Sequence, residues 1–184
     1  MISKVTDEVR ARAARIRLVL MDVDGVLTDG KYFHVPNPAG GLFEVKLFDS
    51  QDGIALQWLY RVGIETGLIS GREAEATLER ARSSKMKYVY MGRTDKLPLF
   101  QEILDKSGFS PDEVAYLGDD LTDAIIMKRV GLSVAVANSR PEVVRMAHYI
   151  TEAPGGSGAL REVTEIILKA QNRWQEILNH YEVD

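Results

Sequence analysis

The stretch Ile16–Asp29, IRLVLMDVDGVLTD, decides the fold of this chain. Its first six residues are mostly apolar and predict a buried strand of an open α/β sheet. Asp22 and Asp24 follow at the carboxyl end of that strand, where such sheets bind their ligands. Gly25 permits a sharp turn there, and a bound Mg²⁺ would neutralise two carboxylates this close together. A strand followed by an ordinary Asp-Gly turn is the simpler alternative for this stretch alone.

Three later segments strengthen the first interpretation. Ser70 follows the mostly apolar run 64–69, Lys96 follows Thr94-Asp95, and Asp119 follows the apolar run 114–117 after one glycine. This order resembles the haloacid dehalogenase superfamily of Mg²⁺-dependent phosphatases, whose signature opens with Asp-x-Asp-x-Thr/Val. Each segment alone is a weak signal, but four in the right order over about a hundred residues are hard to obtain by chance.

Composition narrows the class of protein. The 184 residues are 45% hydrophobic and 27% charged, with a net charge of −4 and no cysteine. The charge and the lack of a basic block argue against nucleic acid as a partner. The lack of cysteine excludes disulfides and cysteine-bound zinc. We find neither the apolar core of a signal peptide nor a run long enough to cross a membrane, and therefore expect a cytoplasmic protein with no membrane partner.

Apolar runs and amphipathic segments alternate along the chain. This alternation predicts an α/β fold, a Rossmann-like three-layer parallel sheet, in a single domain of residues 1–184. Alternating residues around a Pro/Gly-rich turn predict a β-hairpin at about 30–48, too short to be a cap domain. A long closing helix is expected at about 159–180, after the glycines of 155–158.

The superfamily resemblance implies a role for each signature residue. Asp22 is expected to attack phosphorus and to bind Mg²⁺ together with Asp24 and Asp119. Asp24 is expected to be the general acid/base, to touch the substrate, and to bind the metal through its carbonyl. Ser70 and Lys96 are expected to bind the phosphoryl group, with Lys96 also pairing with the nucleophile. From the residues alone, Ser70 could instead be a helix N-cap and Lys96 a solvated lysine at a helix start.

The last motif contains two further acidic residues, Asp120 and Asp123. Asp123 follows Asp119 by one expected helical turn, which would let it face the site as a supporting group. Asp120 could be a metal ligand or lie behind one.

Within the superfamily, the chain resembles the 3-deoxy-D-manno-octulosonate 8-phosphate phosphatase family from Leu18 to about Gln171. The matching segments are 22–30 with the hairpin after it, 52–53, 69–72, 118–123, 130–137 and 155–162. Members of this family are homotetramers of capless subunits, in which a neighbour's hairpin and carboxy-terminal segment help to close the site. Because a small sugar phosphate needs an enclosed site, oligomer contacts could supply the missing lid.

The family resemblance also implies substrate-binding residues. Asp52, Gly53, Arg72 and Arg80 match positions that bind substrate in relatives, and a guanidinium suits a carboxylate or phosphate. No acid lies three or four residues from Arg80, so a simple helical ion pair does not explain it.

The chain departs from the family pattern beside the sugar site, at Asp49, Gln51, Ala55 and Gln57. These changes add a negative charge and remove cations, which could alter specificity. The expected reaction is hydrolysis of 3-deoxy-D-manno-octulosonate 8-phosphate through an aspartyl phosphate. The alternatives are a phosphatase of a nine-carbon sugar acid phosphate, or a non-catalytic binding or regulatory module with this fold. Phosphotransfer between substrates is disfavoured because it usually needs a larger cap.

Overall fold

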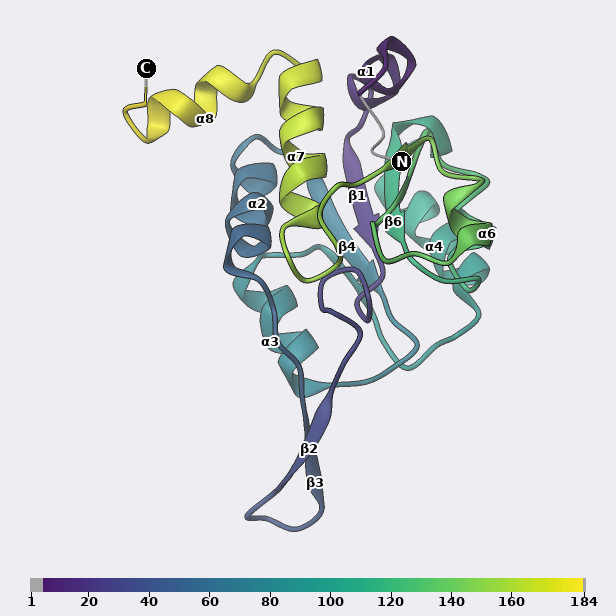
Figure 1. The fold of residues 1–184 in the computed structure, drawn as a ribbon, viewed down its shortest axis with the longest axis vertical. Helices are drawn as coiled ribbons and strands as arrows, with labels where there is room; N and C mark the ends of the chain where they lie inside the picture. The colour runs from purple at the N-terminus through teal and green to yellow at the C-terminus, as the bar shows by residue number, and fades with distance from the viewer. Residues whose placement is uncertain (1–4, 184) are drawn as a thin grey trace.

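A parallel sheet forms the centre of the computed structural model, which describes residues 5–183 (Figure 1). Its six strands lie in the order β5-β4-β1-β6-β7-β8, and every neighbouring pair is parallel. The strands are β1 (Leu18–Met21), β4 (Glu65–Ile69), β5 (Tyr88–Tyr90), β6 (Val114–Gly118), β7 (Leu132–Ala135) and β8 (Tyr149–Ile150). This architecture confirms the predicted α/β fold.

Helices cover both faces of the sheet. They are α1 (Asp7–Ala13), α2 (Ser50–Arg61), α3 (Glu75–Ser83), α4 (Lys96–Ser107), α5 (Ala124–Met127), α6 (Pro141–Val144), α7 (Ala159–Ala170) and α8 (Trp174–His180), with a 3₁₀ turn at Pro111–Glu113. In Figure 1, α2 and α7 lie on one side of β1, and α4 and α6 lie on the other. The order of layers is therefore helix, sheet, helix, as expected for a doubly covered parallel sheet.

Strand β1 explains why both faces must be covered. Successive side chains of a strand point to opposite faces. Val19 and Met21 accordingly join one apolar cluster with α2 and α7, while Leu18 and Leu20 join another with α4 and α5. All four side chains are fully buried. At about 1.5–3 kcal/mol for each buried side chain, this central strand holds the two layers together.

The hairpin projects from the body of the molecule (Figure 1). It consists of β2 (Phe33–Pro36) and β3 (Leu42–Val45), which pair antiparallel, and both strands are largely exposed. The strands lie within the predicted segment 30–48 and are shorter than it. The hairpin has the size of an arm and forms no cap domain.

The carboxy-terminal segment corrects a prediction. Instead of one helix over 159–180, the structure has α7 and α8 separated by Gln171–Arg173. Asn172 adopts a left-handed conformation with φ 57°, which ends a right-handed helix, and the Gln171 side chain donates to the carbonyls of Ala13 and Ile16. Helix α8 consequently leaves in a new direction (Figure 1).

Residues 1–4 and 184 lie outside the described residues, so part of the stretch expected to lack a signal peptide, and both ends of the expected domain, are not described. Within 5–183, every helix is too short or too polar to span a lipid bilayer.

Candidate active site

The signature residues meet at one edge of the sheet. Asp22 directly follows β1, Ser70 follows β4, and Asp119 follows β6. Because β1 pairs in parallel with both β4 and β6, their carboxyl ends lie side by side. Lys96, the first residue of α4, completes the group. The structure thus brings together the four segments that the sequence predicted to form one site.

Lys96 lies at the centre of a buried ionic network. Its Nζ donates to Asp22 Oδ1 at 2.9 Å, to Asp123 Oδ1 at 2.7 Å and to the Tyr116 hydroxyl at 3.2 Å. Only 3% of the Lys96 surface is exposed. The alternative of a solvated lysine at a helix start is therefore wrong.

Within the described part of the chain, Asp119 has a buried, unpaired oxygen in the acidic cluster. Carboxylate oxygens of Asp22, Asp119 and Asp123 lie within 4.8 Å of one another. Both oxygens of Asp123 already accept hydrogen bonds, one from Lys96 and Tyr116 and one from the backbone N–H of Asp119. In contrast, Asp119 Oδ1 is buried and has no hydrogen-bond partner among the described residues. This contrast favours Asp119 as a metal ligand and Asp123 as its support.

The turn after β6 is not the helical turn expected between Asp119 and Asp123. Asp123 is the N-cap of the short helix α5, and its Oδ2 accepts from the backbone N–H groups of Asp119 and Asp120. Asp120 is exposed, and its carboxylate accepts from the Leu121 N–H, outside the cluster. A tight turn, and not one helical turn, places Asp119 and Asp123 together.

The electrostatics of this cluster fit a divalent cation. Burial raises the pKa of Asp22 to about 6. The attraction of Lys96 opposes this shift, and the repulsion of Asp123 adds to it. Burial and the charges of Asp123 and Asp22 raise the pKa of Asp119 to about 7. Mg²⁺ prefers carboxylate oxygens and would relieve this repulsion. Gly25 leaves the space that the Asp119 carboxylate occupies, because a Cβ at position 25 would lie 2.2 Å from Asp119 Oδ2.

Ser70 is buried at the end of β4. Its Oγ accepts from the Arg72 N–H at 3.2 Å, a local turn contact typical of serine. Helix α3 begins at Glu75, with Ala74 as its N-cap. The N-cap alternative for Ser70 is therefore wrong, and its hydroxyl proton stays available to a ligand.

Asp24 has a partner that the sequence analysis missed. Lys46 Nζ donates to Asp24 Oδ1 at 2.6 Å, and the Lys46 side chain is fully buried. Lys46 follows strand β3 of the hairpin. Lys46 lies 22 residues after Asp24 in the chain, and no sequence motif connects the two.

Arg72 and Arg80 are both held by specific contacts. Arg72 donates to Glu44 Oε2 at 2.9 Å and stacks over the Tyr32 ring, with 3.9 Å from Cζ to the centroid. Arg80 donates to the Asp49 carbonyl at 3.0 Å. Gly53 makes room for Arg80, because a Cβ there would lie 2.5 Å from its Nη1.

Asp52 joins α2 to α7. Its Oδ1 accepts from the backbone N–H of Arg161 at 2.9 Å, at the start of α7, while its Oδ2 is buried without a hydrogen-bond partner among the described residues. Burial raises the pKa of Asp52 to about 6, against the hydrogen bond from Arg161. Asp52 thus has a structural role, and its contact with substrate stays a prediction.

The structure explains one departure from the family pattern, Asp49, and places two others, Ala55 and Gln51. Asp49 is the N-cap of α2 and accepts from the N–H groups of Gln51 and Asp52. Its negative charge at a helix N-terminus is stabilising. Ala55 is buried in the core, and Gln51 is exposed.

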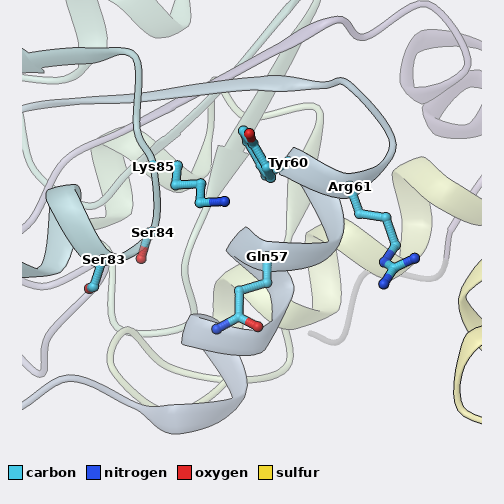
Figure 2. Close-up of a pocket in the computed structure, with 6 residues that line it drawn as sticks. All are labelled: Gln57, Tyr60, Arg61, Ser83, Ser84 and Lys85. Atoms are coloured by element: carbon cyan, nitrogen blue, oxygen red, sulfur yellow. The ribbon is translucent and has the colours of Figure 1, made fainter.

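Gln57 lies in a different place. It lines a pocket of about 450 Å³ with Tyr60, Arg61, Ser83, Ser84 and Lys85 (Figure 2). The pocket joins α2 to the carboxyl end of α3, and neither signature aspartate lines it. These helix ends precede β4 and β5, so they belong to the edge of the sheet opposite Asp22. Because Asp22 and Asp24 do not line this pocket, it is not the candidate active site.

The glycine-rich segment before α7 packs on the turn that follows Asp24. Gly155 has no room for a side chain, because a Cβ there would lie 1.8 Å from the Gly25 carbonyl oxygen. Asn138 joins the two segments: its Nδ2 donates to that carbonyl at 3.0 Å, and its Oδ1 accepts from the Gly155 N–H at 2.6 Å. The sequence analysis noted the glycines but missed Asn138.

Comparisons with known proteins agree with this geometry. The family of haloacid dehalogenase-like hydrolases matches residues 73–161. A 3-deoxy-D-manno-octulosonate 8-phosphate phosphatase from Yersinia pestis is 42% identical over 92% of this chain and 88% of its own. The phosphatase of that name from Escherichia coli strain K12 is 40% identical over 94% of this chain and 89% of its own.

A solved structure shares the fold over nearly its full length. The 3-deoxy-D-manno-octulosonate 8-phosphate phosphatase from Moraxella catarrhalis, crystallised with a magnesium ion, a phosphate ion and a KDO molecule, superposes with a TM-score of 0.89. It is 36% identical, and the match covers 96% of this chain and 99% of that one. The identity and coverage of these relatives, together with the acidic cluster around Lys96, show that this chain belongs to the 3-deoxy-D-manno-octulosonate 8-phosphate phosphatase family.

Proposed function

We propose that this chain is a Mg²⁺-dependent phosphatase that hydrolyses 3-deoxy-D-manno-octulosonate 8-phosphate. The observation that carries the proposal is the convergence of Asp22, Lys96 and Asp119 beside Ser70 in a protein of this family. The magnesium, phosphate and sugar acid bound by the Moraxella catarrhalis relative support the same cofactor and substrate class.

The reaction begins at Asp22. Its carboxylate attacks phosphorus, an aspartyl phosphate forms, and the bond from phosphorus to the sugar oxygen breaks. Asp24 donates a proton to the departing alkoxide. Asp24 then takes a proton from a water molecule, whose oxygen attacks phosphorus and releases inorganic phosphate and free Asp22.

Charge neutralisation makes this attack feasible. Asp22, Asp119 and the carbonyl of Asp24 would hold Mg²⁺, which supplies positive charge to the phosphoryl oxygens. Lys96 favours the ionised form of Asp22 and orients it through its 2.9 Å hydrogen bond. The Ser70 hydroxyl donates to a phosphoryl oxygen.

Arg72 and Arg80 suit the acidic part of the substrate. The Nε of Arg72 is buried without a hydrogen-bond partner among the described residues, two positions after Ser70. A donor in that state favours an anionic ligand, because a buried unpaired donor costs about 1–3 kcal/mol. Arg80 is held beside Asp52 and Gly53 by its bond to the Asp49 carbonyl, and we assign it to the same subsite.

We further propose that the active form is a cytoplasmic homotetramer. The hairpin carries large apolar side chains in water: Phe33 is 53% exposed, Leu42 65% and Leu47 70%. Apolar residues clustered on a projecting arm favour a protein partner over solvent. A second copy of the chain seated there would also enclose the open active site.

A phosphate-release screen tests the substrate. With Mg²⁺, we expect the eight-carbon acid phosphate to be hydrolysed with a higher kcat/KM than a nine-carbon acid phosphate or neutral sugar phosphates. A flat profile would reject the substrate but not the phosphatase chemistry, and hydrolysis without any divalent cation would reject the chemistry. Light scattering in solution tests the tetramer separately.

A further inference from the structure

Lys46 stands out among the residues of the hairpin. Of residues 30–48, all of which the structure describes, it is the only one that is buried, although the strands beside it are largely exposed. Its side chain has no exposed surface. A lysine in that state must find counter-charges, because an unpaired buried ammonium costs several kcal/mol.

The counter-charges come from the active site and from the hairpin itself. Lys46 Nζ lies 2.6 Å from Asp24 Oδ1 and 3.4 Å from Glu44 Oε1. Glu44 Oε2 in turn accepts from Arg72 at 2.9 Å. Glu44 belongs to β3 and Lys46 follows the strand directly, so this end of the hairpin presents a cation to Asp24 and an anion to Arg72.

The contact leaves Asp24 half free. Its Oδ1 is held by Lys46, and its Oδ2 has no hydrogen-bond partner among the described residues. The carboxylate side chain is 21% exposed, so the free oxygen is open to a ligand. A carboxylate pinned by one oxygen keeps its other oxygen in one place, which is what transfer of a proton to a departing alkoxide requires.

We propose that Lys46 is a positioning residue that fixes the carboxylate of Asp24 for proton transfer, and that Glu44 ties the same strand to Arg72. The hairpin therefore orders the catalytic site of its own subunit. This inference rests on the proposed phosphatase reaction, in which Asp24 is the general acid/base. It adds a role for the hairpin that is independent of any contact with a second copy.

The test compares Lys46→Met with Lys46→Arg. Methionine keeps the length of the side chain and loses the charge, while arginine keeps the charge. We expect kcat to fall about 10²-fold in Lys46→Met, as a misplaced catalytic group does, with a much smaller change in KM. Lys46→Arg should recover most of kcat. The control is Lys31→Met, which removes an exposed hairpin lysine paired only with Asp29 and should leave kcat unchanged.

The leaving group supplies a sharper readout. The value of kcat/KM reports the steps up to departure of the alcohol, and p-nitrophenolate departs without a proton. For Lys46→Met, kcat/KM should therefore fall strongly with the alkyl phosphate that the wild-type enzyme hydrolyses best, and little with p-nitrophenyl phosphate. A merely structural role for Lys46 would lower both equally.

Three results would overturn the assignment. They are an unchanged kcat in Lys46→Met, an equal loss with both phosphates, and a Lys46→Arg variant as slow as Lys46→Met. Thermal unfolding of each variant shows whether the fold is retained. A wild-type enzyme that hydrolyses other alkyl phosphates but not the eight-carbon acid phosphate would reject the proposed substrate and leave this test intact.

Discussion

Two buried lysines hold the two signature aspartates, and they do so from opposite kinds of structure. Lys96 begins helix α4 and contacts Asp22 from within the packed body of the protein. Lys46 follows strand β3 and contacts Asp24 from a projecting hairpin. Both amine-to-carboxylate distances are short, at 2.9 Å and 2.6 Å. The proposed nucleophile and the proposed acid/base thus have separate supports.

The surroundings of the two lysines differ in exposure to solvent. Around Lys96, Asp123 and Tyr116 are fully buried, so every charge and hydroxyl there depends on the others. Around Lys46, the carboxylate of Asp24 is 21% exposed and Glu44 is 14% exposed, so water can replace part of a lost contact. The core of the fold therefore holds Asp22, the proposed nucleophile, and the more exposed hairpin holds Asp24, the proposed acid/base.

The largest expected effect is loss of the nucleophile itself. Asp22→Asn should lower turnover by about 10⁴-fold or more, because an amide cannot form the aspartyl phosphate. The fold should persist, since Asn Oδ1 can still accept from Lys96. Steady-state phosphate release and thermal unfolding measure the two outcomes. Near-normal turnover by this variant would refute the assignment of Asp22.

Removal of the metal should come next in size. Chelation with EDTA should abolish phosphate release, and added Mg²⁺ should restore it. The carboxyl pKa of Asp119 is raised to about 7 and that of Asp22 to about 6 without a cation. Protons therefore compete with the metal near neutral pH.

The pH dependence of this effect has a definite sign. At pH 8 both carboxyls are ionised and repel each other, so Mg²⁺ should raise the unfolding temperature clearly. At pH 5.5 both are largely protonated, and the same Mg²⁺ concentration should raise it less. Equal stabilisation at both pH values would contradict the placement of the metal on this pair.

A third test compares the lysines directly. Lys96→Met leaves Asp22 and Asp123 as uncompensated buried charges, and should lower the free energy of unfolding by about 3–5 kcal/mol. Lys46→Met should cost clearly less stability, because solvent reaches Asp24. Urea unfolding of both variants measures the difference. A Lys46→Met variant as unstable as Lys96→Met would remove the distinction between the two supports.

The convergence of the residues around Asp22, which the core holds, was largely predictable from the sequence. Each of Asp22, Ser70 and Asp119 ends an apolar run, and the carboxyl ends of parallel strands must meet at one edge. Local sequence therefore determined their convergence. Lys96 needed the family resemblance, because a lysine after Thr94-Asp95 has no distinctive local pattern.

The contacts that the hairpin makes with Asp24 and Arg72 were not predictable from the sequence. The alternating residues predicted a hairpin, but nothing local sets the angle at which it leaves the sheet. Without that angle, Lys46 and Glu44 are ordinary charged residues of an exposed strand. The break at Asn172 was missed for a related reason: an apolar stripe continues past it into α8, and a stripe cannot show that the backbone changes direction.

The smallest expected effect concerns Asp52, which joins α2 to α7 beside the proposed substrate subsite. Its pKa is raised to about 6 by burial, so folding opposes its ionisation. The cost is absent well below the unfolded pKa of about 3.9, where the carboxyl is protonated in both states, and is complete above the folded pKa. Asp52→Asn should thus be about 1–3 kcal/mol more stable than the wild type at pH 8 and within about 0.5 kcal/mol of it at pH 4.

Urea unfolding at both pH values checks this prediction, with phosphate release measured in parallel. Asn Oδ1 can still accept from the Arg161 N–H, so the join between α2 and α7 should survive the substitution. A variant less stable than the wild type at pH 8 would mean that the negative charge of Asp52 is itself stabilising. An increase in KM together with the gain in stability would place Asp52 in the substrate subsite, since it would show that binding uses a charge that the fold disfavours.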